Sequence, residues 1–260
     1  MRSGVRKSHA QKILLTRSVD DSRDSARLLT NLGYDVCNIP FIEIEPRFDE
    51  LEIELIEQQL GRFDGFIFIS INAAKYGADM LAANQDLLKQ NYQVLAVGTR
   101  TAKELSEQFS NVLCPDNGVG AEALMATTEM ADIHGQSFLV IRGKNGNAWL
   151  GEELVRRHAS VDFYDCYTRR RPRTLEKELA NTFTEQLFDV CFLHSAHAAA
   201  NLIEASGKLG QAIIRTCAIV GSAAIKDVLI DYGWKGRIEV AASPKNLDMV
   251  NCLVALKFTD

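Results

Sequence analysis

The sequence lacks any long apolar run and any excess of positive charge. None of its apolar runs approaches the roughly 20 residues that cross a bilayer, and the basic start, MRSGVRKSHAQK, is not followed by one either. We therefore expect neither a membrane-spanning protein nor a secretory signal. Lys and Arg number 29 against 34 Asp and Glu, for a net charge of −5. This balance argues against general nucleic-acid binding, although a local basic cleft remains compatible with it.

Signatures of cofactors, metals and nucleophilic catalysis are also missing. No GxGxxG follows a first strand and no GxxxxGK[ST] occurs, so dinucleotides and nucleoside triphosphates lose support. His194 and His197 lie close in sequence but have no Cys or carboxylate companions, and no HExxH occurs. No GxSxG surrounds Ser70 or Ser195. We expect no cofactor and no metal, and an enzyme with such a site would work mainly by holding its substrate.

The six cysteines are scattered and no two form a CxxC pair. Most lie in or beside apolar, strand-like runs, which is typical of buried reduced thiols. We therefore expect a cytoplasmic protein without disulfides.

What the sequence does contain is one series of landmarks written twice. FDGFIFISINAAKYGADML begins at Phe63 and FDVCFLHSAHAAANLIEA at Phe188, so that Ser70 and Ser195 are 125 positions apart. Four more pairs follow in the same order: ILLTR with FLVIRG, LGYDVCNIP with HASVDFYDC, VLAVGTRTAKEL with CAIVGSAAIKDVL, and VLCPDNGVGAEALM with EVAASPKNLDMVNCL. The nearly constant offset indicates an internal duplication whose period is the size of a domain.

Each copy alternates short apolar runs with helical patterns. The runs are rich in Val, Ile, Leu and Phe, as in strands buried on both faces. Gly33 and Gly233 are placed to end helices. The pattern predicts an α/β fold with two similar, doubly wound parallel-sheet domains facing a cleft. The predicted helices span residues 20–32, 72–81, 101–109, 120–130, 148–157, 196–205, 223–232 and 246–256.

Small and polar residues gather where the predicted strands end. In open parallel sheets, ligands bind beyond the carboxyl ends of the strands, and helix N-termini there receive anions. Any one of these residues could simply cap a helix. The sequence has six of these strand-end turns, and several of them contain Arg or Lys. Together they favour a binding site for a polyanion. The candidate binding residues are Arg17, Ser70, Asn72, Thr99, Arg100, Thr101, Arg142, Gly143, Lys144, Ser195, His197, Gly221, Ser222 and Ala223.

Seven segments together resemble the uroporphyrinogen-III synthase family, over nearly the whole chain from about Ile13. They are LLTR, NLGYDVCNIPFIEIEP, FDGFIFISINAA, VLAVGTRTA, LVIRG, DFYDCYTRR and AIVGSAAIKDVLIDYG. Each motif is degenerate, but their order and spacing together are specific. The resemblance implies that the chain crosses between domains near Pro40 to Pro46 and returns near Tyr167 to Arg173, through a two-strand linker. It implies one domain of residues 1–40 plus 167–260 and another of 41–166, where the repeat alone suggests a single cut near 131.

The resemblance also implies an activity in tetrapyrrole (haem) biosynthesis. Members of the family are hydro-lyases that cyclise the linear tetrapyrrole hydroxymethylbilane to uroporphyrinogen III, with loss of water and inversion of the last pyrrole ring. The substrate carries eight carboxylates, which suits an anion-receiving edge. The implied protein is a cytoplasmic, cofactor-independent monomer that makes transient contact with hydroxymethylbilane synthase and has no nucleic-acid or membrane partner.

Site roles carry over onto matching positions. Tyr167 matches a family Tyr whose phenol, projecting into the cleft, would donate a proton to the departing hydroxyl, although a Tyr beside a linker often merely packs. Thr101 matches a Thr that would donate to a carboxylate. Ser70 and Ser195 match strand-end serines. Arg17 and Arg142 match basic residues of the cleft rim, for which the alternative is a salt bridge at the surface.

The sequence departs from the family pattern at three positions. Ala224 stands where many relatives carry Thr, Ser18 where Pro is common, and Asn147 where Arg is often seen. These departures leave the assignment of individual carboxylates open.

Two other functions fit the same pattern. A two-lobed protein that binds a small anion without catalysis would have the same cleft, and turnover distinguishes it from the synthase. A sugar-nucleotide glycosyltransferase has two similar lobes, but the acidic motif that holds a nucleotide is missing. Binding of a uridine nucleotide would revive that interpretation.

Overall fold

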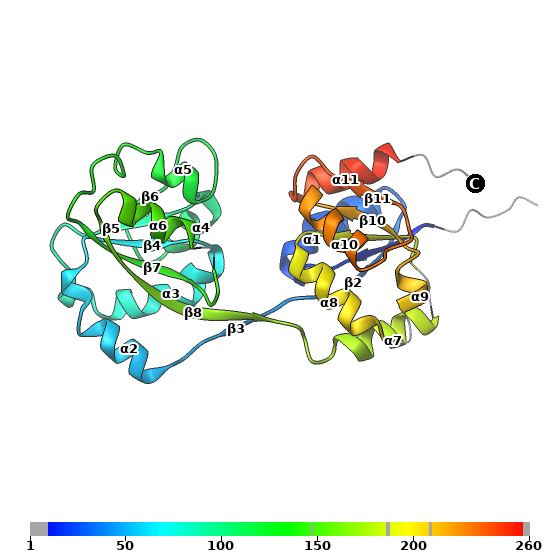
Figure 1. Cartoon of the computed structure of the whole chain (residues 1–260), viewed down its shortest axis with the longest axis horizontal. Helices are drawn as coiled ribbons and strands as arrows, with labels where there is room; N and C mark the ends of the chain where they lie inside the picture. Colours follow the sequence, from blue (N-terminus) through cyan, green and yellow to red (C-terminus); the bar gives the residue numbers. More distant parts are fainter. Residues whose placement is uncertain (1–9, 147, 186–187, 208–209, 257–260) are drawn as a thin grey trace, which may run out of the picture. The chain divides into compact units, whose positions relative to one another are not determined.

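The computed structural model describes residues 10–146, 148–185, 188–207 and 210–256. The chain forms two compact units (Figure 1). One contains the residues up to Glu43 together with those from Arg170 onward, and the other contains Ile44–Arg169. The basic residues 1–9 and Asn147, which departs from the family pattern, lie outside the described residues.

The first unit is built on a five-stranded parallel sheet. Its strand order is β2-β1-β9-β10-β11. Leu14 in β1 lies opposite both Cys37 and Cys191, its partners in the flanking strands. The order changes direction between β1 and β9, which makes this the topological switch point of the sheet. The strands are β1 (Lys12–Leu15), β2 (Asp35–Asn38), β9 (Val190–Leu193), β10 (Cys217–Val220) and β11 (Ile238–Val240).

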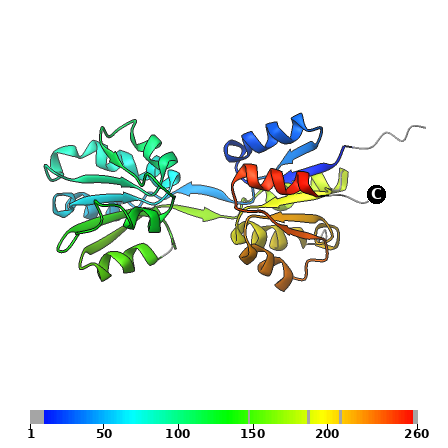
Figure 2. The same ribbon diagram turned by 90° about the horizontal axis from the view of Figure 1, so that it is seen from above.

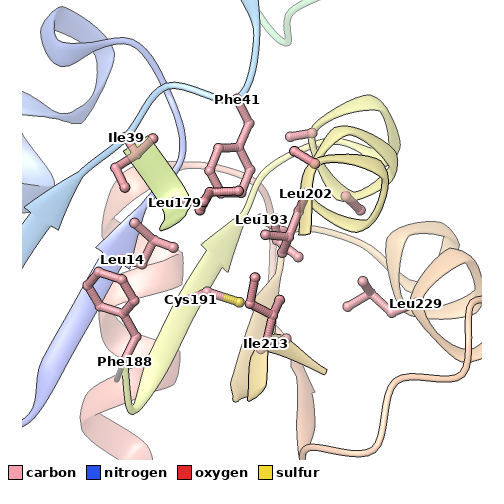
Figure 3. Packing of buried hydrophobic residues seen from close by; sticks show 14 of the residues in the cluster. Leu14, Ile39, Phe41, Leu179, Phe188, Cys191, Leu193, Leu202, Ile213 and Leu229 are labelled. Carbon is pink, nitrogen blue, oxygen red and sulfur yellow. The ribbon is translucent and has the colours of Figure 1, made fainter. Parts of the chain in front are cut away.

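Helices cover both faces of this sheet because successive strand residues point to opposite sides. Ile13, Leu15 and Phe192 pack with the helices on one face, whereas Leu14 and Cys191 pack on the other. Figure 2 shows α1 and α11, in blue and red, on one side and yellow and orange helices on the other. Figure 3 shows, from close by, the buried residues on the face that contains Leu14 and Cys191. The helices are α1 (Val19–Asn31) and α11 (Asn246–Ala255) on the first face, and α7 (Leu175–Glu185), α8 (Ala196–Ser206), α9 (Gly210–Ile213) and α10 (Ala223–Asp231) on the second.

The second unit contains a six-stranded sheet of order β3-β8-β7-β4-β5-β6. Its core is also divided by the sheet, with Leu139 and Ile141 of β7 on one face and Phe138 and Val140 on the other. The strands are β3 (Glu43–Pro46), β4 (Gly65–Phe68), β5 (Gln93–Ala96), β6 (Val112–Leu113), β7 (Ser137–Gly143) and β8 (Ser160–Arg170). The helices are α2 (Glu50–Glu57), α3 (Ile71–Ala83), α4 (Thr99–Leu105), α5 (Ala121–Met125) and α6 (Trp149–Arg156), with 3₁₀ turns at Leu60–Arg62 and Gln85–Leu87.

The two sheets have the same topology once the sequence repeat is applied. The repeat pairs β1 with β7, β2 with β8, β9 with β4, β10 with β5, and β11 with β6. With these pairs, β2-β1-β9-β10-β11 becomes β8-β7-β4-β5-β6, which is the order observed in the second sheet beside the additional edge strand β3. The second switch point therefore lies between β7 and β4, the partners of β1 and β9.

The predicted doubly wound parallel sheets are confirmed, and most predicted helices lie within two residues of their observed bounds. Gly33 and Gly233 follow helix ends with φ of +89° and +81°, as predicted. The helix predicted over residues 120–130 is much shorter and ends at Met125. Helix α2 was missed because its sequence, ELEIELIE, alternates with a period close to that of a strand.

The described residues contain no helix whose length and apolar character would let it cross a membrane. All six cysteines are free thiols. In the same part of the chain, no three His, Cys, Asp or Glu side chains gather in a way that could hold a metal ion.

Candidate functional site

Open parallel sheets bind ligands at the carboxyl ends of the strands on either side of the switch point. In the first unit, β1 leads into Thr16 and Arg17, and β9 into His194 and Ser195. In the second unit, the corresponding edge is formed where β4 meets Ser70 and β7 meets Lys144.

Arg17 is held in place by groups of two helices. Its guanidinium donates to Asn246 Oδ1 at 3.4 Å, from the start of α11, and lies 3.7 Å from the carboxylate of Asp21 in α1. Beside it, the buried Thr16 donates to the carbonyl of Phe192 at 2.6 Å and so ties β1 to β9. About a third of the Arg17 side chain stays exposed, so the cation is positioned and still reachable.

His194, at the end of β9, has both ring nitrogens buried without a hydrogen-bond partner among the described residues. Burial disfavours the charged imidazolium, and the nearby Arg17 cation adds to this effect, while Asp21 opposes it. Together they lower the pKa of His194 from 6.5 to about 4. The first unit therefore carries a neutral histidine at its switch point.

The remaining candidates of the first unit lie at two helix starts. Ser195 caps α8 by accepting from the amide of Ala198 at 3.1 Å, and His197 is exposed in the first turn. Ser222 is the N-cap of α10, but its side chain makes no capping hydrogen bond, and Ala223 is exposed. Gly221 is buried, and a Cβ there would approach Pro244 Cβ to 2.6 Å, so no side chain fits at this position.

The second unit repeats this arrangement. Ser70 caps α3 by accepting from the amide of Ala73 at 3.0 Å, and the half-buried Asn72 follows in the first turn. Helix α4 begins after Gly98, which has no side chain to cap it, with Thr99 and Arg100 exposed and Thr101 buried. Thus the matched pair α3 and α8 is serine-capped, whereas Gly98 and Ser222, the N-caps of the matched pair α4 and α10, make no side-chain capping hydrogen bond.

Arg142, Gly143 and Lys144 lie at the end of β7 and precede a helix, as predicted, with a turn between them. Arg142 and Gly143 belong to β7, and the next helix begins only at Trp149 because a turn intervenes. Arg142 forms an ion pair with Asp165 of β8 at 2.8 Å, and its guanidinium carbon lies 3.8 Å from the centroid of the Phe163 ring. It is therefore engaged with the neighbouring strand in a mostly buried ion pair, whereas the alternative expected for this residue was a salt bridge at the surface. Lys144 is exposed in the turn.

Tyr167 lies inside β8 and is completely buried, so its phenol does not project from the unit as expected. Its ring covers Gly143, where a Cβ would come within 2.5 Å of two ring carbons. Its hydroxyl lies 3.0 Å from Ser70 Oγ and accepts from Arg169 Nη2 at 2.8 Å. Sequence reasoning did not single out Arg169, although DFYDCYTRR contains it. The structure thus joins Ser70 and Tyr167, 97 positions apart, in one hydrogen-bonded group.

A family model described as uroporphyrinogen-III synthase HemD matches residues 23–251. The chain belongs to the uroporphyrinogen-III synthase family. The match includes both switch-point edges except Thr16 and Arg17, and it includes Tyr167 with its two partners.

Curated uroporphyrinogen-III synthases are similar to this chain at modest identity. The Escherichia coli K12 protein is 28% identical over 160 residues, which is 60% of this chain and 64%, or slightly less than two thirds, of that protein. The Chlorobaculum parvum protein is 26% identical over 200 residues, 75% of this chain and 79% of that protein.

Two solved structures have the same fold. Uroporphyrinogen-III synthetase from Helicobacter pylori matches with a TM-score of 0.64 at 16% identity, covering 95% of this chain and all of that one. A mutant uroporphyrinogen III synthase from Thermus thermophilus matches with a TM-score of 0.56 at 15% identity, covering 94% of this chain and 98% of that one.

Proposed function

We propose that this chain is an active uroporphyrinogen-III synthase, which converts hydroxymethylbilane to uroporphyrinogen III. The observation that carries the proposal is the family match over residues 23–251. The relatives named above carry the same name, and the fold is the one found in the two solved synthases.

We propose that the strand-end edges of both units bind the carboxylates of the substrate. The N-termini of α4 and α10, which have no side-chain cap, offer a partial positive charge. Arg17 in the first unit and the exposed Lys144 in the second add cations. Ser195 and His197 lie at the same edge of the first unit and complete the set of donors there.

The chemistry of the reaction asks for orientation more than for reactive groups. Cleavage of the bond to the hydroxyl group, with transfer of a proton to it, releases water and leaves an azafulvene cation. The substituted carbon of the last pyrrole ring then attacks this cation and forms a spiro intermediate. The older bond from that carbon to the preceding methylene bridge breaks, the free α-carbon of the same ring bonds to the bridge instead, and that carbon loses its proton. Holding the flexible chain so that this carbon attacks can lower the barrier by several kcal/mol. Backbone dipoles at the helix starts can stabilise the transient charge.

Tyr167 is our proposed proton donor to the departing hydroxyl. Among the described residues of the second unit, its hydroxyl is the one phenol that is bonded to both a cation and a helix cap. Because the ring is fully buried, this role requires that a bound substrate uncovers the hydroxyl.

The test is the product isomer. The purified protein is incubated with hydroxymethylbilane generated enzymatically, and the products are oxidised and resolved. We expect the type III isomer. Formation of the type I isomer alone, as in the uncatalysed closure, would reject the proposal, and binding of the substrate without conversion would favour the anion-binding alternative.

We further propose that the protein acts in the cytoplasm as a monomer, in transient contact with hydroxymethylbilane synthase. The six free cysteines support a reducing compartment. Size-exclusion chromatography with light scattering, with and without hydroxymethylbilane synthase, tests the last two points.

A further inference from the structure

The Tyr167 hydroxyl makes two hydrogen bonds, and the direction of the one with Arg169 is fixed. A guanidinium can only donate, so the Tyr167 oxygen must accept from Arg169. Ser70 Oγ already accepts from the amide of Ala73. Either hydroxyl can donate in the 3.0 Å contact between Ser70 and Tyr167. When Ser70 donates, Tyr167 accepts twice and its own proton is left for another acceptor.

Arg169 differs from the other arginines near the end of β8. Arg142 pairs with Asp165, Arg170 with Glu43, and Arg171 with Glu176 and Glu204. Arg169 is exposed, and within the described part of the chain no carboxylate lies within ion-pair distance of it. Its guanidinium carbon lies 5.2 Å from the centroid of the Tyr167 ring. One donor therefore serves the phenol, and the others have no anionic partner among the described residues.

An exposed guanidinium with spare donors is suited to a carboxylate, which it can bind through two parallel hydrogen bonds. The same group touches the hydroxyl of a residue that is otherwise completely enclosed. Of the described side chains that are hydrogen-bonded to the phenol, Arg169 is the exposed one. A negative group bound to Arg169 would therefore lie close to the Tyr167 hydroxyl.

We propose that Arg169 binds one carboxylate of the substrate and at the same time positions the Tyr167 hydroxyl for proton donation. This inference rests on the proposed synthase function. When the proton leaves Tyr167 for the departing hydroxyl, the C–O bond breaks, water forms, and the Arg169 and Ser70 donors face the phenolate oxygen. The proton later lost from the ring-closing carbon returns to that oxygen, so no other reactant is needed.

The two roles predict separate kinetic effects. Loss of the carboxylate contact raises KM, whereas loss of the donor to Tyr167 lowers kcat. We expect Arg169→Ala to raise KM about tenfold and to lower kcat about tenfold. Arg169→Lys retains the charge and should keep KM within about threefold of wild type, while kcat stays reduced because an ammonium lacks the planar fork. Arg173→Ala removes another exposed arginine outside this group and serves as the matched control.

The decisive experiment measures these variants alone and combined with Tyr167→Phe, and adds millimolar guanidinium chloride to Arg169→Ala. We expect guanidinium to restore part of the lost kcat, and we expect Arg169→Ala to lower kcat no further in the Tyr167→Phe background while KM still rises. Wild-type kinetics in Arg169→Ala, or an additive loss of kcat with no rescue, would overturn the proposal. The proposal would also be overturned if the activity lost in Arg169→Ala were fully explained by a lower unfolding midpoint of that variant. Failure of the wild-type protein to form the type III isomer would instead reject the synthase function itself, and this inference with it.

Discussion

Gly143 and Tyr167 form one packed pair on neighbouring strands. A Cβ at position 143 would lie 2.5 Å from two carbons of the Tyr167 ring and 3.0 Å from its hydroxyl oxygen. The ring is completely buried and cannot retreat without disturbing the core around it. The position of the phenol therefore depends on the lack of a side chain in β7.

We expect Gly143→Ala to lower the free energy of unfolding by about 2 kcal/mol, because the added methyl overpacks the site. Turnover should fall as well, since the hydroxyl is displaced from Ser70 and Arg169. Urea unfolding and steady-state kinetics measure both effects. Lys144→Ala changes the exposed neighbouring residue and provides the comparison for stability. An unchanged unfolding midpoint in Gly143→Ala would contradict this account of the packing.

We expect Tyr167→Phe to slow turnover more than it weakens binding. The ring keeps its packing, but the proton and its two hydrogen bonds are lost. A positioned acid contributes at least about a hundredfold in typical enzymes, so kcat should fall by about that factor while KM changes little. Steady-state kinetics with enzymatically generated substrate checks this. Unchanged turnover would remove Tyr167 from the mechanism.

His194 gives the first unit a dependence on pH. Its pKa is lowered from 6.5 to about 4 in the folded protein, mainly by burial and then by Arg17. The unfolded state therefore binds more protons below pH 6.5, so this contribution to stability is complete above pH 6.5 and is lost as pH falls towards 4.

We expect the free energy of unfolding to fall by about 2 kcal/mol more in wild type than in His194→Gln between about pH 7.5 and pH 5. Urea titrations at the two values measure this difference. His197→Gln removes an exposed histidine from the same turn and should behave like wild type in stability. Equal pH dependence in His194→Gln and wild type would show that the imidazole is not held neutral.

At the scale of elements, the serine caps of α3 and α8 are a matched pair with different surroundings. Ser70 and Ser195 each accept from the amide three residues later. Only Ser70 is also bonded to Tyr167 in the described structure. The duplication has thus kept one structural role in both units, and a second contact distinguishes the copy in the second unit.

We expect Ser70→Ala and Ser195→Ala each to lower the free energy of unfolding by about 1 kcal/mol, the usual cost of losing an N-cap. Only Ser70→Ala removes a partner of the phenol, so it should lower kcat clearly more than Ser195→Ala. Unfolding and kinetic measurements on both variants provide the comparison. Equal effects on kcat would mean that the bond to Tyr167 has no part in turnover.

Much of the fold could be predicted from the sequence because its signals are local. Buried strands such as Gly65–Phe68 appear as apolar runs, and Gly33 marks a helix end through its positive φ. Helix α2 could not be recognised in this way because its acidic and apolar residues alternate as in a strand. Its helical character depends on Ile53 and Ile56, which pack against the hydrophobic cluster of the second unit.

The positions of most candidate residues at strand ends were predicted from the sequence, and their contacts were predicted less well. Ser70, Ser195 and the starts of α4 and α10 lie at strand ends, where parallel topology places them. The burial of Tyr167 and Thr101 and the pairing of Arg142 with Asp165 depend on which residues face each other across strands and helices. Sequence spacing does not contain that information, and for the same reason Arg169 was overlooked.

At the scale of the whole molecule, each unit has its own sheet and its own pair of hydrophobic clusters. The chain leaves the first unit after Glu43 and returns at Arg170, and the crossings were expected near residues 40–46 and 167–173. We predict from these separate cores that the two units fold independently. The second unit is continuous in sequence, which makes it the simpler one to isolate.

We expect residues 44–169 to fold when expressed alone. Its buried clusters lie on both faces of a complete sheet, and a domain of this size can bury a sufficient core. Circular dichroism and a cooperative urea transition measure this, and the full-length chain is the reference. A non-cooperative transition in the isolated segment would show that the unit depends on the rest of the chain.

The two sheets have matching strand orders, but their strands follow one another along the chain in a different order. This difference has a consequence for the origin of the chain. In sequence order, one repeat supplies β1, β2, β4, β5 and β6, and the other supplies β7 to β11, yet each sheet takes two strands from one repeat and three from the other. In each repeat, the chain passes from one sheet to the other after its second strand, β2 or β8. A half-length ancestor with the same crossing would have completed its sheet by exchanging strands with a second molecule. Two such molecules contain every pairing among these ten strands, so fusion of an ancient strand-swapped homodimer would create the present topology without rearranging either sheet.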